Sequence, residues 1–376
     1  MKQMKLMLLL SFAFAFVSCH PLKHAPQEKN IDPVHASMSR NAAIFLSDTS
    51  IHAVSIGIYK DGKKYTGHYG ELDRGKANTP TDKTIYEIAS VSKTLTGVLV
   101  AKAVLEDRLR LEEDIRTYLE EDFPNFQYKG YPVKVKHLVT HTSGLPAFLP
   151  ESINDLLTEF NESLPFKMSA IQEQYSREAF FRDLHQIKLD TIPGAVYSYS
   201  NVDAELMAHI LERVYQVPFE ELLQRYFSKT ARMTNTKIIL AEKDKANLAN
   251  GYGMTGKLVP HEPTTLYGAE GGVKATMPDL VNYMEFQMDS TNKVVVESQK
   301  VLYVNGNRRL AYYWPVKSND DFGNYFSHHG GAFGSQNWFF ILPEHNLGIS
   351  VVTNQSDLNT PEKLMKTVKS LIHDLK

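Results

Sequence analysis

A serine and a lysine three residues apart, Ser90 and Lys93, form the first pattern in this chain with residue types suited to chemistry. On a helix, this spacing brings the two side chains together on one face. A serine hydroxyl is a poor nucleophile until a neighbouring group removes its proton, and a lysine amine is one group able to do so. The alternative is that Ser90 only caps a helix, which serine often does.

The surroundings of this Ser-x-x-Lys pattern favour a catalytic role. Ser90 follows an extended segment, residues 84–88, and precedes apolar residues at helical spacing, so we predict an amphipathic helix that begins near Ser90. The inner face of this helix would carry Leu95, Val98, Leu99, Lys102 and Leu105. A second match, Ser290 and Lys293, lies in a polar stretch without a helical pattern. A chain of this length should contain roughly one or two matches by chance.

Two further groups of polar residues lie later in the chain. Tyr199 and Asn201 come after a Pro-Gly pair and before a predicted helix at residues 203–215, which places a phenol and an amide at a helix start. A predicted strand at residues 325–328 ends in a cluster of histidine and glycine, namely His328, His329, Gly330 and Gly331. The glycines would let a substrate backbone lie close to this strand.

Together, these motifs resemble those of the serine β-lactamase and penicillin-binding-protein superfamily. They match best the branch with class C β-lactamases, D-Ala-D-Ala carboxypeptidases and family VIII esterases, which combines S-x-x-K, Y-x-N and K-T-G or H-x-G. Three further segments are similar to that branch: LVTHTSGLP at residues 138–146, the PG…YSYSN segment at 193–201, and the GG…T..DL segment at 271–280. The resemblance runs from about residue 40 to the C-terminus.

The resemblance implies that Ser90 is the nucleophile, Lys93 its proton partner and Tyr199 a second general base or acid. An unperturbed lysine titrates at ~10.4 and a tyrosine at ~10, so neither alone is a ready base at neutral pH. Placed together, the ammonium favours the phenolate and the phenolate draws the lysine proton. The pair would then titrate as a unit.

For substrate binding, the resemblance implies that Asn201 holds the substrate amide and that the strand with His328 and Gly330 lines the site. The backbone N–H groups of Ser90 and Gly331 would form the oxyanion hole, where each donor contributes about 3 kcal/mol to transition-state stabilisation. The resemblance implies no cofactor. The predicted substrate is a small molecule or a peptidoglycan peptide.

Three residues depart from the pattern of this branch. His328 stands where its β-lactamases usually have lysine, and a histidine is only partly charged near neutral pH. We therefore expect carboxylate binding to weaken as the pH rises through ~6.5. His329 replaces a small hydroxyl residue by a bulky ring. Glu270 precedes a glycine pair where we expect a small residue, and the sequence offers no reason for it.

Other ligand-binding patterns lack a required partner. Residues 251–258 contain G-x-G-x-x-G and most of a P-loop, but Leu258 replaces the Ser or Thr that would contact the metal. We predict a turn there. His137 and His141 could share a helix face, but no Glu follows His137 and no third ligand is evident, so we predict no metal site. The sequence has no G-x-S-x-G, which argues against an α/β-hydrolase.

The elements that must position these motifs are strands near both ends and helices between them. Strand signals occur at residues 52–59, 64–69, 302–304, 310–314, 325–328, 336–342 and 347–353. Helical patterns dominate residues 111–254 and return at 277–288 and 361–375. We predict an α+β fold in which one antiparallel sheet, built from both termini, is flanked by helices. Residues 42–110 and 255–376 would form this part, with residues 111–254 as an inserted all-helical subdomain.

The composition excludes several classes of protein. The chain has 376 residues, 22% of them charged, and a net charge of −2, which fits a globular enzyme and argues against nucleic-acid binding. It contains a single cysteine, Cys19, which excludes an internal disulfide framework and a multi-cysteine metal site. Oligomeric state does not follow from the composition.

The N-terminus predicts export. Lys2 and Lys5 precede an apolar run at residues 6–17, which is shorter than the roughly 20 residues of a membrane-spanning helix. We predict a signal peptide at residues 1–18, lipidation of Cys19 in a sequence that resembles a lipoprotein box, and a tether at residues 19–41. The predicted protein is an exported, membrane-anchored serine hydrolase. The alternative is a non-catalytic penicillin-binding or sensing module on the same fold.

Overall fold

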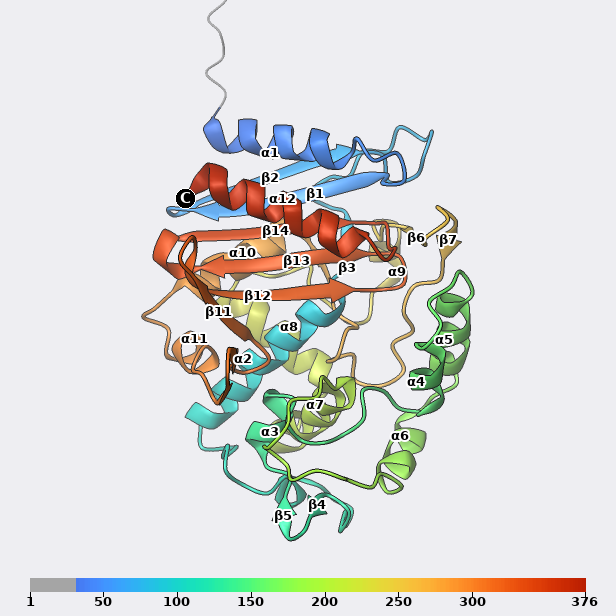
Figure 1. Cartoon of the computed structure of the whole chain (residues 1–376), viewed down its shortest axis with the longest axis vertical. Helices are drawn as coiled ribbons and strands as arrows, with labels where there is room; N and C mark the ends of the chain where they lie inside the picture. Colours follow the sequence, from blue (N-terminus) through green and yellow to red (C-terminus); the bar gives the residue numbers. More distant parts are fainter. Residues whose placement is uncertain (1–31) are drawn as a thin grey trace, which may run out of the picture. The chain divides into compact units, whose positions relative to one another are not determined.

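A computed structural model describes residues 32–376 of the chain. At its centre lies an antiparallel sheet with the strand order β2-β1-β14-β13-β12-β11-β10-β9 (Figure 1). Its strands are β1 (Ala53–Lys60), β2 (Lys63–Gly70), β9 (Tyr303–Asn305), β10 (Arg308–Leu310), β11 (Pro315–Asn319), β12 (Gly323–Gly331), β13 (Gln336–Leu342) and β14 (Leu347–Thr353).

Strands from near the two ends of the described chain lie side by side as the second and third strands of this sheet. β1 pairs with β14, for example Ile56 with Val351, so the predicted α+β sheet built from both termini is confirmed. All of β14 and nearly all of β1 are buried, because helices cover both faces of the sheet. On one face lie α1 (Pro33–Phe45) and α12 (Thr360–Leu375), and on the other lies α10 (Met277–Met288).

The first of these helices corrects the predicted tether. Residues 33–41 belong to α1, whose Met38 and Ala42 are fully buried against α12 and the sheet. The sequence offers little periodicity there, so the helix depends on tertiary packing of its apolar face. The predicted signal peptide and Cys19 lie outside the described residues. Within residues 32–376, no helix combines the length and apolar composition needed to cross a bilayer.

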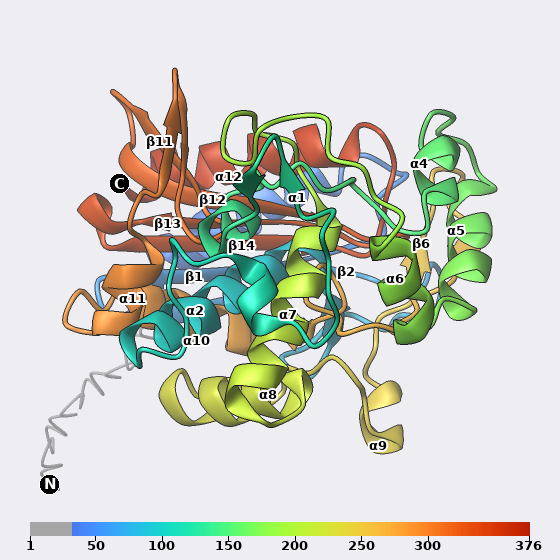
Figure 2. The same ribbon diagram turned by 90° about the horizontal axis from the view of Figure 1, so that it is seen from below.

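Helices are the main regular elements in the middle of the chain, as predicted, although they cover fewer than half of its residues; in the view from below they lie in front of the sheet (Figure 2). Its helices are α2 (Ser92–Leu105), α3 (Val135–Val139), α4 (Ser152–Leu156), α5 (Leu164–Glu173), α6 (Arg177–Leu184), α7 (Asn201–Tyr215), α8 (Phe219–Thr230), α9 (Glu242–Lys245) and α11 (Lys293–Ser298). The prediction of an all-helical insertion is wrong in detail, since residues 111–254 also contain short strands. These are β4 (Gln127–Tyr128), β5 (Tyr131–Pro132) and β6 (Gly251–Tyr252), the last of which pairs with β7 (Leu258–Val259).

The helix after Ser90 is more deeply buried than predicted. Residues 92–101 of α2 are all buried, so α2 is a central helix rather than an amphipathic one. It packs against α7, α8 and α11 as well as the loop after β10. A Cβ on Gly97 would lie 2.3 Å from the Tyr312 carbonyl oxygen, so only glycine permits this close approach.

The loop against α2 corrects one predicted strand. Residues 310–314 were expected to form a strand, but β10 ends at Leu310 and β11 begins at Pro315. Tyr312, Tyr313 and Trp314 are buried in between, and the Tyr313 N–H donates to the Val139 carbonyl at 2.7 Å. These large side chains fill the space between the sheet and the helices, so their burial outweighs their strand propensity.

Candidate active site

Ser90 lies in a tight turn between β3 (Ile85–Glu87), which pairs with β8 (Lys274–Thr276), and α2. This 3-10 turn contains Ala89, whose φ of 45° is a backbone conformation that costs an alanine about 1–2 kcal/mol. Asn337 of β13 stabilises the turn by donating from Nδ2 to the Ile88 carbonyl at 3.0 Å. The N-cap of α2 is Val91, so helix capping does not account for Ser90.

Lys93 is fully buried and points at Ser90. Its Nζ lies 3.3 Å from Ser90 Oγ and 2.6 Å from Asn201 Oδ1, and it also donates to the Glu270 carbonyl oxygen. These three oxygens match the three N–H donors of an ammonium group. The same Nζ lies 4.9 Å from the centre of the Tyr199 ring. Lys93 therefore links the three predicted catalytic or binding side chains around it.

Tyr199 completes the arrangement from the start of α7. Its hydroxyl donates to Ser90 Oγ at 2.8 Å. The neighbouring Ser200 is the N-cap of α7, and its Oγ accepts from the Asp203 N–H at 3.1 Å. This cap places Tyr199 just before the helix and Asn201 as its first residue, so both side chains face Lys93 and Ser90. The sequence-based prediction of a phenol and an amide at a helix start is confirmed.

The segment at residues 138–146 positions Tyr199. The His141 ring packs on the Tyr199 ring with 4.6 Å between centroids, and its Nδ1 accepts from the Ser200 N–H at 3.3 Å. The same nitrogen lies 3.2 Å from a carboxylate oxygen of Asp203. Burial lowers the pKa of His141 well below its usual value and raises the pKa of Asp203 well above its own. Burial thus disfavours the charged form of each residue.

The end of β12 borders the turn that carries Ser90. A Cβ on Gly330 would lie 2.2 Å from the Ile88 carbonyl oxygen, so a side chain at this position would push β12 away from the turn. Gly331, the next residue, lines the same cavity as Ser90. The predicted placement of the two glycines beside the nucleophile is thus observed.

His328 does not play the role expected from its position in the motif. Its ring is 6% exposed and its Nδ1 lies 2.8 Å from the His329 carbonyl oxygen, which can only accept, so Nδ1 carries the proton. Burial and the nearby Lys93 charge lower the pKa of His328 to about 3. The ring is therefore uncharged at neutral pH, and the expectation that it offers a partial charge to a substrate carboxylate is wrong. His329 packs on Trp338 instead, 4.9 Å between ring centroids.

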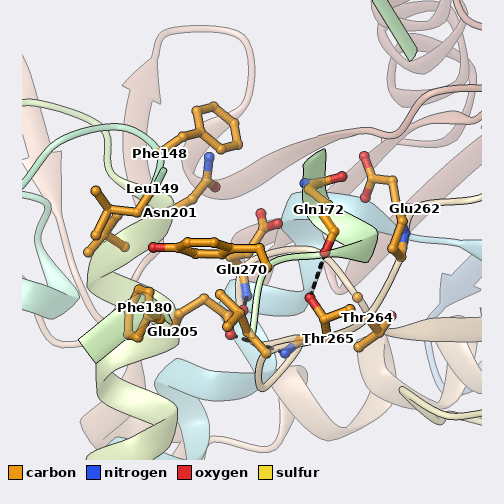
Figure 3. A pocket seen from close by; sticks show the side chains of 16 residues that line it. Phe148, Leu149, Gln172, Phe180, Asn201, Glu205, Glu262, Thr264, Thr265 and Glu270 are labelled. Atoms are coloured by element: carbon orange, nitrogen blue, oxygen red, sulfur yellow. Dashed lines mark hydrogen bonds between the residues drawn. The ribbon is translucent and has the colours of Figure 1, made fainter. Parts of the chain in front are cut away.

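A cavity of about 260 Å³ opens at Ser90. Tyr199, Asn201 and Gly331 line it, together with an apolar wall formed by Phe148, Leu157, Phe160, Leu164, Met168 and Phe333. Its polar wall includes Glu262 and Glu270, which also line a smaller adjoining pocket of about 50 Å³ (Figure 3). None of the described residues that line the cavity is Lys or Arg.

Glu270, which departs from the motif pattern, contacts Lys93 in two ways. Its backbone oxygen accepts from Lys93, and its carboxylate lies 3.8 Å from Lys93 Nζ. Its N–H donates at 2.9 Å to Glu205, a buried residue of α7 whose other carboxylate oxygen accepts from the Tyr267 N–H at 2.7 Å. Burial raises the pKa of Glu205 to about 7. Glu205 lies four residues after Asn201, and no motif in the sequence pointed to it.

The remaining sequence patterns lie apart from this site. Ser290 and Lys293 are both exposed, near the start of α11. Residues 251–258 fold as the β6–β7 hairpin, which confirms the predicted turn. His137 Nδ1 accepts from the Lys134 N–H at 3.1 Å, and no group of three or more potential metal ligands occurs among the described residues.

Comparisons with known proteins agree with this geometry. A family model described as Beta-lactamase matches residues 34–373. A beta-lactamase of Yersinia enterocolitica is 25% identical over 329 residues, which cover 83% of this chain and 78% of the relative. A beta-lactamase of Providencia stuartii is 23% identical over 411 aligned positions, which cover 98% of this chain and 96% of the relative.

Two solved structures share the fold. The beta-lactamase/D-alanine carboxypeptidase of Pseudomonas syringae superposes with a TM-score of 0.76 at 18% identity, over 92% of this chain and 100% of that one. The beta-lactamase/D-alanine carboxypeptidase of Yersinia pestis, complexed with citrate, gives a TM-score of 0.76 at 20% identity, over 91% of this chain and 99% of that one. The chain described here belongs to the beta-lactamase family of serine hydrolases.

Proposed function

We propose that this protein is an exported serine hydrolase that forms an acyl-enzyme on Ser90. The observation that carries this proposal is the pair of contacts to Ser90 Oγ, from the Tyr199 hydroxyl at 2.8 Å and from Lys93 Nζ at 3.3 Å. A nucleophilic hydroxyl must lose its proton to a neighbouring group and later regain it, and these two contacts supply such neighbours.

The proposed reaction has two steps. Ser90 Oγ attacks the substrate carbonyl carbon while its proton passes to the Tyr199–Lys93 pair, and the pair returns that proton to the leaving group as the carbonyl–leaving-group bond breaks. A water molecule then attacks the acyl-enzyme, loses its proton to the same pair and releases Ser90 with its proton restored. The backbone N–H groups of Ser90 and Gly331 would stabilise the oxyanion in both steps. Asn201 would hold an amide or carbonyl group of the substrate.

The candidate substrates are a β-lactam, a D-Ala-D-Ala-type peptide and a small ester. Both β-lactams and D-Ala-D-Ala peptides carry a carboxylate, but the cavity has no lysine or arginine in its described lining and His328 is uncharged. The apolar wall around Phe148 and Phe160 suits an uncharged acyl group. These features favour a small ester over the two carboxylate-bearing classes.

Covalent labelling tests the proposal directly. We expect a fluorescent penicillin or a p-nitrophenyl ester to add one acyl group to the protein, detected by intact mass, and we expect Ser90→Ala to abolish this adduct. Ser290→Ala is the matched control, because it removes the serine of the second Ser-x-x-Lys pattern. Labelling that survives Ser90→Ala and disappears with Ser290→Ala would refute the assignment of the nucleophile.

A non-catalytic penicillin-binding or sensing module is the rival function. It predicts that penicillin or ester binds reversibly, with no mass increase and no released p-nitrophenol. Because the module would keep the same fold, the two functions differ only in this chemical step.

We further propose that residues 1–18 are a signal peptide and that lipidated Cys19 anchors the mature protein in a membrane, facing the periplasm or the cell exterior. Residues 20–32 would then form the tether, since α1 begins at Pro33. A single lipidated cysteine is the anchor this sequence offers, so Cys19→Ala should move the protein from the membrane to the soluble fraction. Unchanged partition of Cys19→Ala between these fractions would contradict lipidation.

A further inference from the structure

We propose that Glu205 is a positioning residue, which holds the backbone carbonyl of Glu270 against Lys93. This inference rests on the proposed hydrolase function and adds a residue to its machinery. Glu205 does not line the cavity at Ser90, so it acts through Glu270 and Lys93. Figure 3 shows Glu205 and Glu270 in the smaller pocket that adjoins this cavity.

The loop between β7 and β8 takes its backbone hydrogen bonds from Glu205. Residues 260–273 contain no helix or strand, so the buried N–H groups of this loop need acceptors from elsewhere. Glu205 Oε2 accepts from the Tyr267 N–H at 2.7 Å and from the Gly268 N–H at 3.2 Å, and its Oε1 accepts from the Glu270 N–H at 2.9 Å. One side chain of α7, 3% exposed, thus binds three of the four N–H groups of residues 267–270.

The carbonyl groups of the same loop contact α2. Lys93 Nζ donates to the Glu270 carbonyl oxygen, and Thr96 Oγ1, one helical turn later, lies 3.4 Å from the Ala269 carbonyl oxygen. The loop is therefore fixed between two helices, with Glu205 on the side of α7. An ammonium group has three donors, and the Glu270 carbonyl is the third acceptor of Lys93 beside Ser90 and Asn201. Holding that carbonyl in place keeps Lys93 Nζ directed at Ser90.

This role requires a carboxylate. Both oxygens of a carboxylate accept hydrogen bonds, whereas a glutamine amide has one accepting oxygen and an NH₂ group that donates. In the amide orientation that keeps the bonds to Tyr267 and Gly268, the NH₂ group would face the Glu270 N–H. Glu205→Gln therefore removes the contact to Glu270 with almost no change in side-chain size.

Steady-state kinetics of Glu205→Gln with a p-nitrophenyl ester test the inference. We expect kcat to fall about tenfold, the effect of one hydrogen bond, with KM nearly unchanged, because the lost bond is to the loop and not to the substrate. Asp279→Asn, in α10, is the matched control. Asp279 is 2% exposed and also accepts a backbone N–H, from Asn235 at 2.7 Å, but that partner is not a neighbour of Lys93. The control should lose stability without this fall in kcat.

A pH profile separates this role from a purely structural one. Burial, and then the Glu270 carboxylate, raise the pKa of Glu205 to about 7, while its backbone hydrogen bonds and the Lys93 charge act in the opposite direction. A proton on Glu205 replaces an acceptor by a donor, so the ratio of wild-type kcat to Glu205→Gln kcat should decrease as the pH falls from 8 to 6. Tyr267 and Tyr313 also face Glu205, but burial raises their pKa values, so both stay uncharged over this range.

Wild-type kcat in Glu205→Gln, or the same fall in kcat in Asp279→Asn, would overturn the inference and leave the hydrolase function intact. If Glu205→Gln does not fold, Glu205→Asp replaces it, since its shorter carboxylate cannot reach all three N–H groups; wild-type kcat in that variant would refute the role. If the wild type hydrolyses no ester, the hydrolase function fails, and a crystal structure of Glu205→Gln decides the inference. We expect the Glu270 carbonyl oxygen to lie beyond hydrogen-bonding distance of Lys93 Nζ in that structure, and a retained contact would refute the role of Glu205.

Discussion

The Tyr199 hydroxyl donates a hydrogen bond of 2.8 Å to Ser90 Oγ, although 109 positions separate the two residues in the sequence. Ser90 comes from the turn before α2, and Tyr199 from the residue before the N-cap of α7. α2 and α7 pack against each other, so the helix packing sets this distance. The chemistry of the site thus depends on how two helix starts are brought together.

Removing the Tyr199 hydroxyl tests its role in proton transfer. Tyr199→Phe keeps the ring that packs on His141 but loses the donor to Ser90, so we expect kcat to fall by about 10²- to 10⁴-fold with little change in KM. Steady-state kinetics with a p-nitrophenyl ester measure both constants. Tyr197→Phe, two residues earlier, is the matched control and should retain activity. A Tyr199→Phe enzyme with unaltered kcat would remove Tyr199 from the mechanism.

Much of the site could be predicted from the sequence because each motif is local. Ser90 and Lys93 are one helical turn apart, and Tyr199 and Asn201 flank one helix cap, so short-range geometry fixes each pair. The sheet built from both termini was likewise visible, because β1 and β14 carry dense apolar patterns that only a covered sheet would bury. The resemblance to a known family added the prediction that the separate motifs form one active site.

The parts that failed depend on long-range packing. α1 was mistaken for tether because its short apolar stripe becomes stable only against α12 and the sheet. Residue type and motif position predict a partly charged His328. They do not reveal that the ring is buried, and burial removes its charge. Glu205 was missed for the same reason: its partners, such as the Tyr267 N–H, lie 62 positions away.

A pair of glycine variants tests the close approach of β12 to the catalytic turn. Gly330→Ala would place a Cβ 2.2 Å from the Ile88 backbone oxygen, which cannot move without distorting the turn, so we expect a loss of about 1–3 kcal/mol in unfolding free energy and of most activity. Gly331→Ala would meet side-chain atoms alone, the Gln336 amide at 3.1 Å and the His329 ring at 3.4 Å, so we expect a smaller loss of stability than for Gly330→Ala. Urea denaturation compares the two. Equal stability of the two variants would contradict the proposed contact.

The pH dependence of substrate binding follows from the uncharged state of His328. Because its pKa is about 3, its charge does not change between pH 5 and 8, so the ring cannot favour a carboxylate at the lower end of this range. We expect the KM values of a cephalosporin and of a neutral ester to vary with pH in parallel over that range. A cephalosporin KM that rises with pH while the ester KM stays constant would show that His328 does read the carboxylate.

The same burial predicts a pH dependence of stability. A histidine with a usual pKa of 6.5 and a folded-state value of about 3 binds its proton more readily in the unfolded chain between those values. The folded state therefore loses stability as the pH falls from 6.5 toward 3, by up to about 1.4 kcal/mol per pH unit for this group. His137 and His209, whose pKa values burial lowers to about 4, act in the same direction.

Urea unfolding of the wild type and of His328→Gln at pH 4.5, 5.5 and 7 measures how steeply the free energy of unfolding changes with pH. The variant should be less stable at pH 7, but its unfolding free energy should fall less steeply as the pH is lowered. The same steepness in both proteins would contradict the lowered pKa of His328 in the folded state.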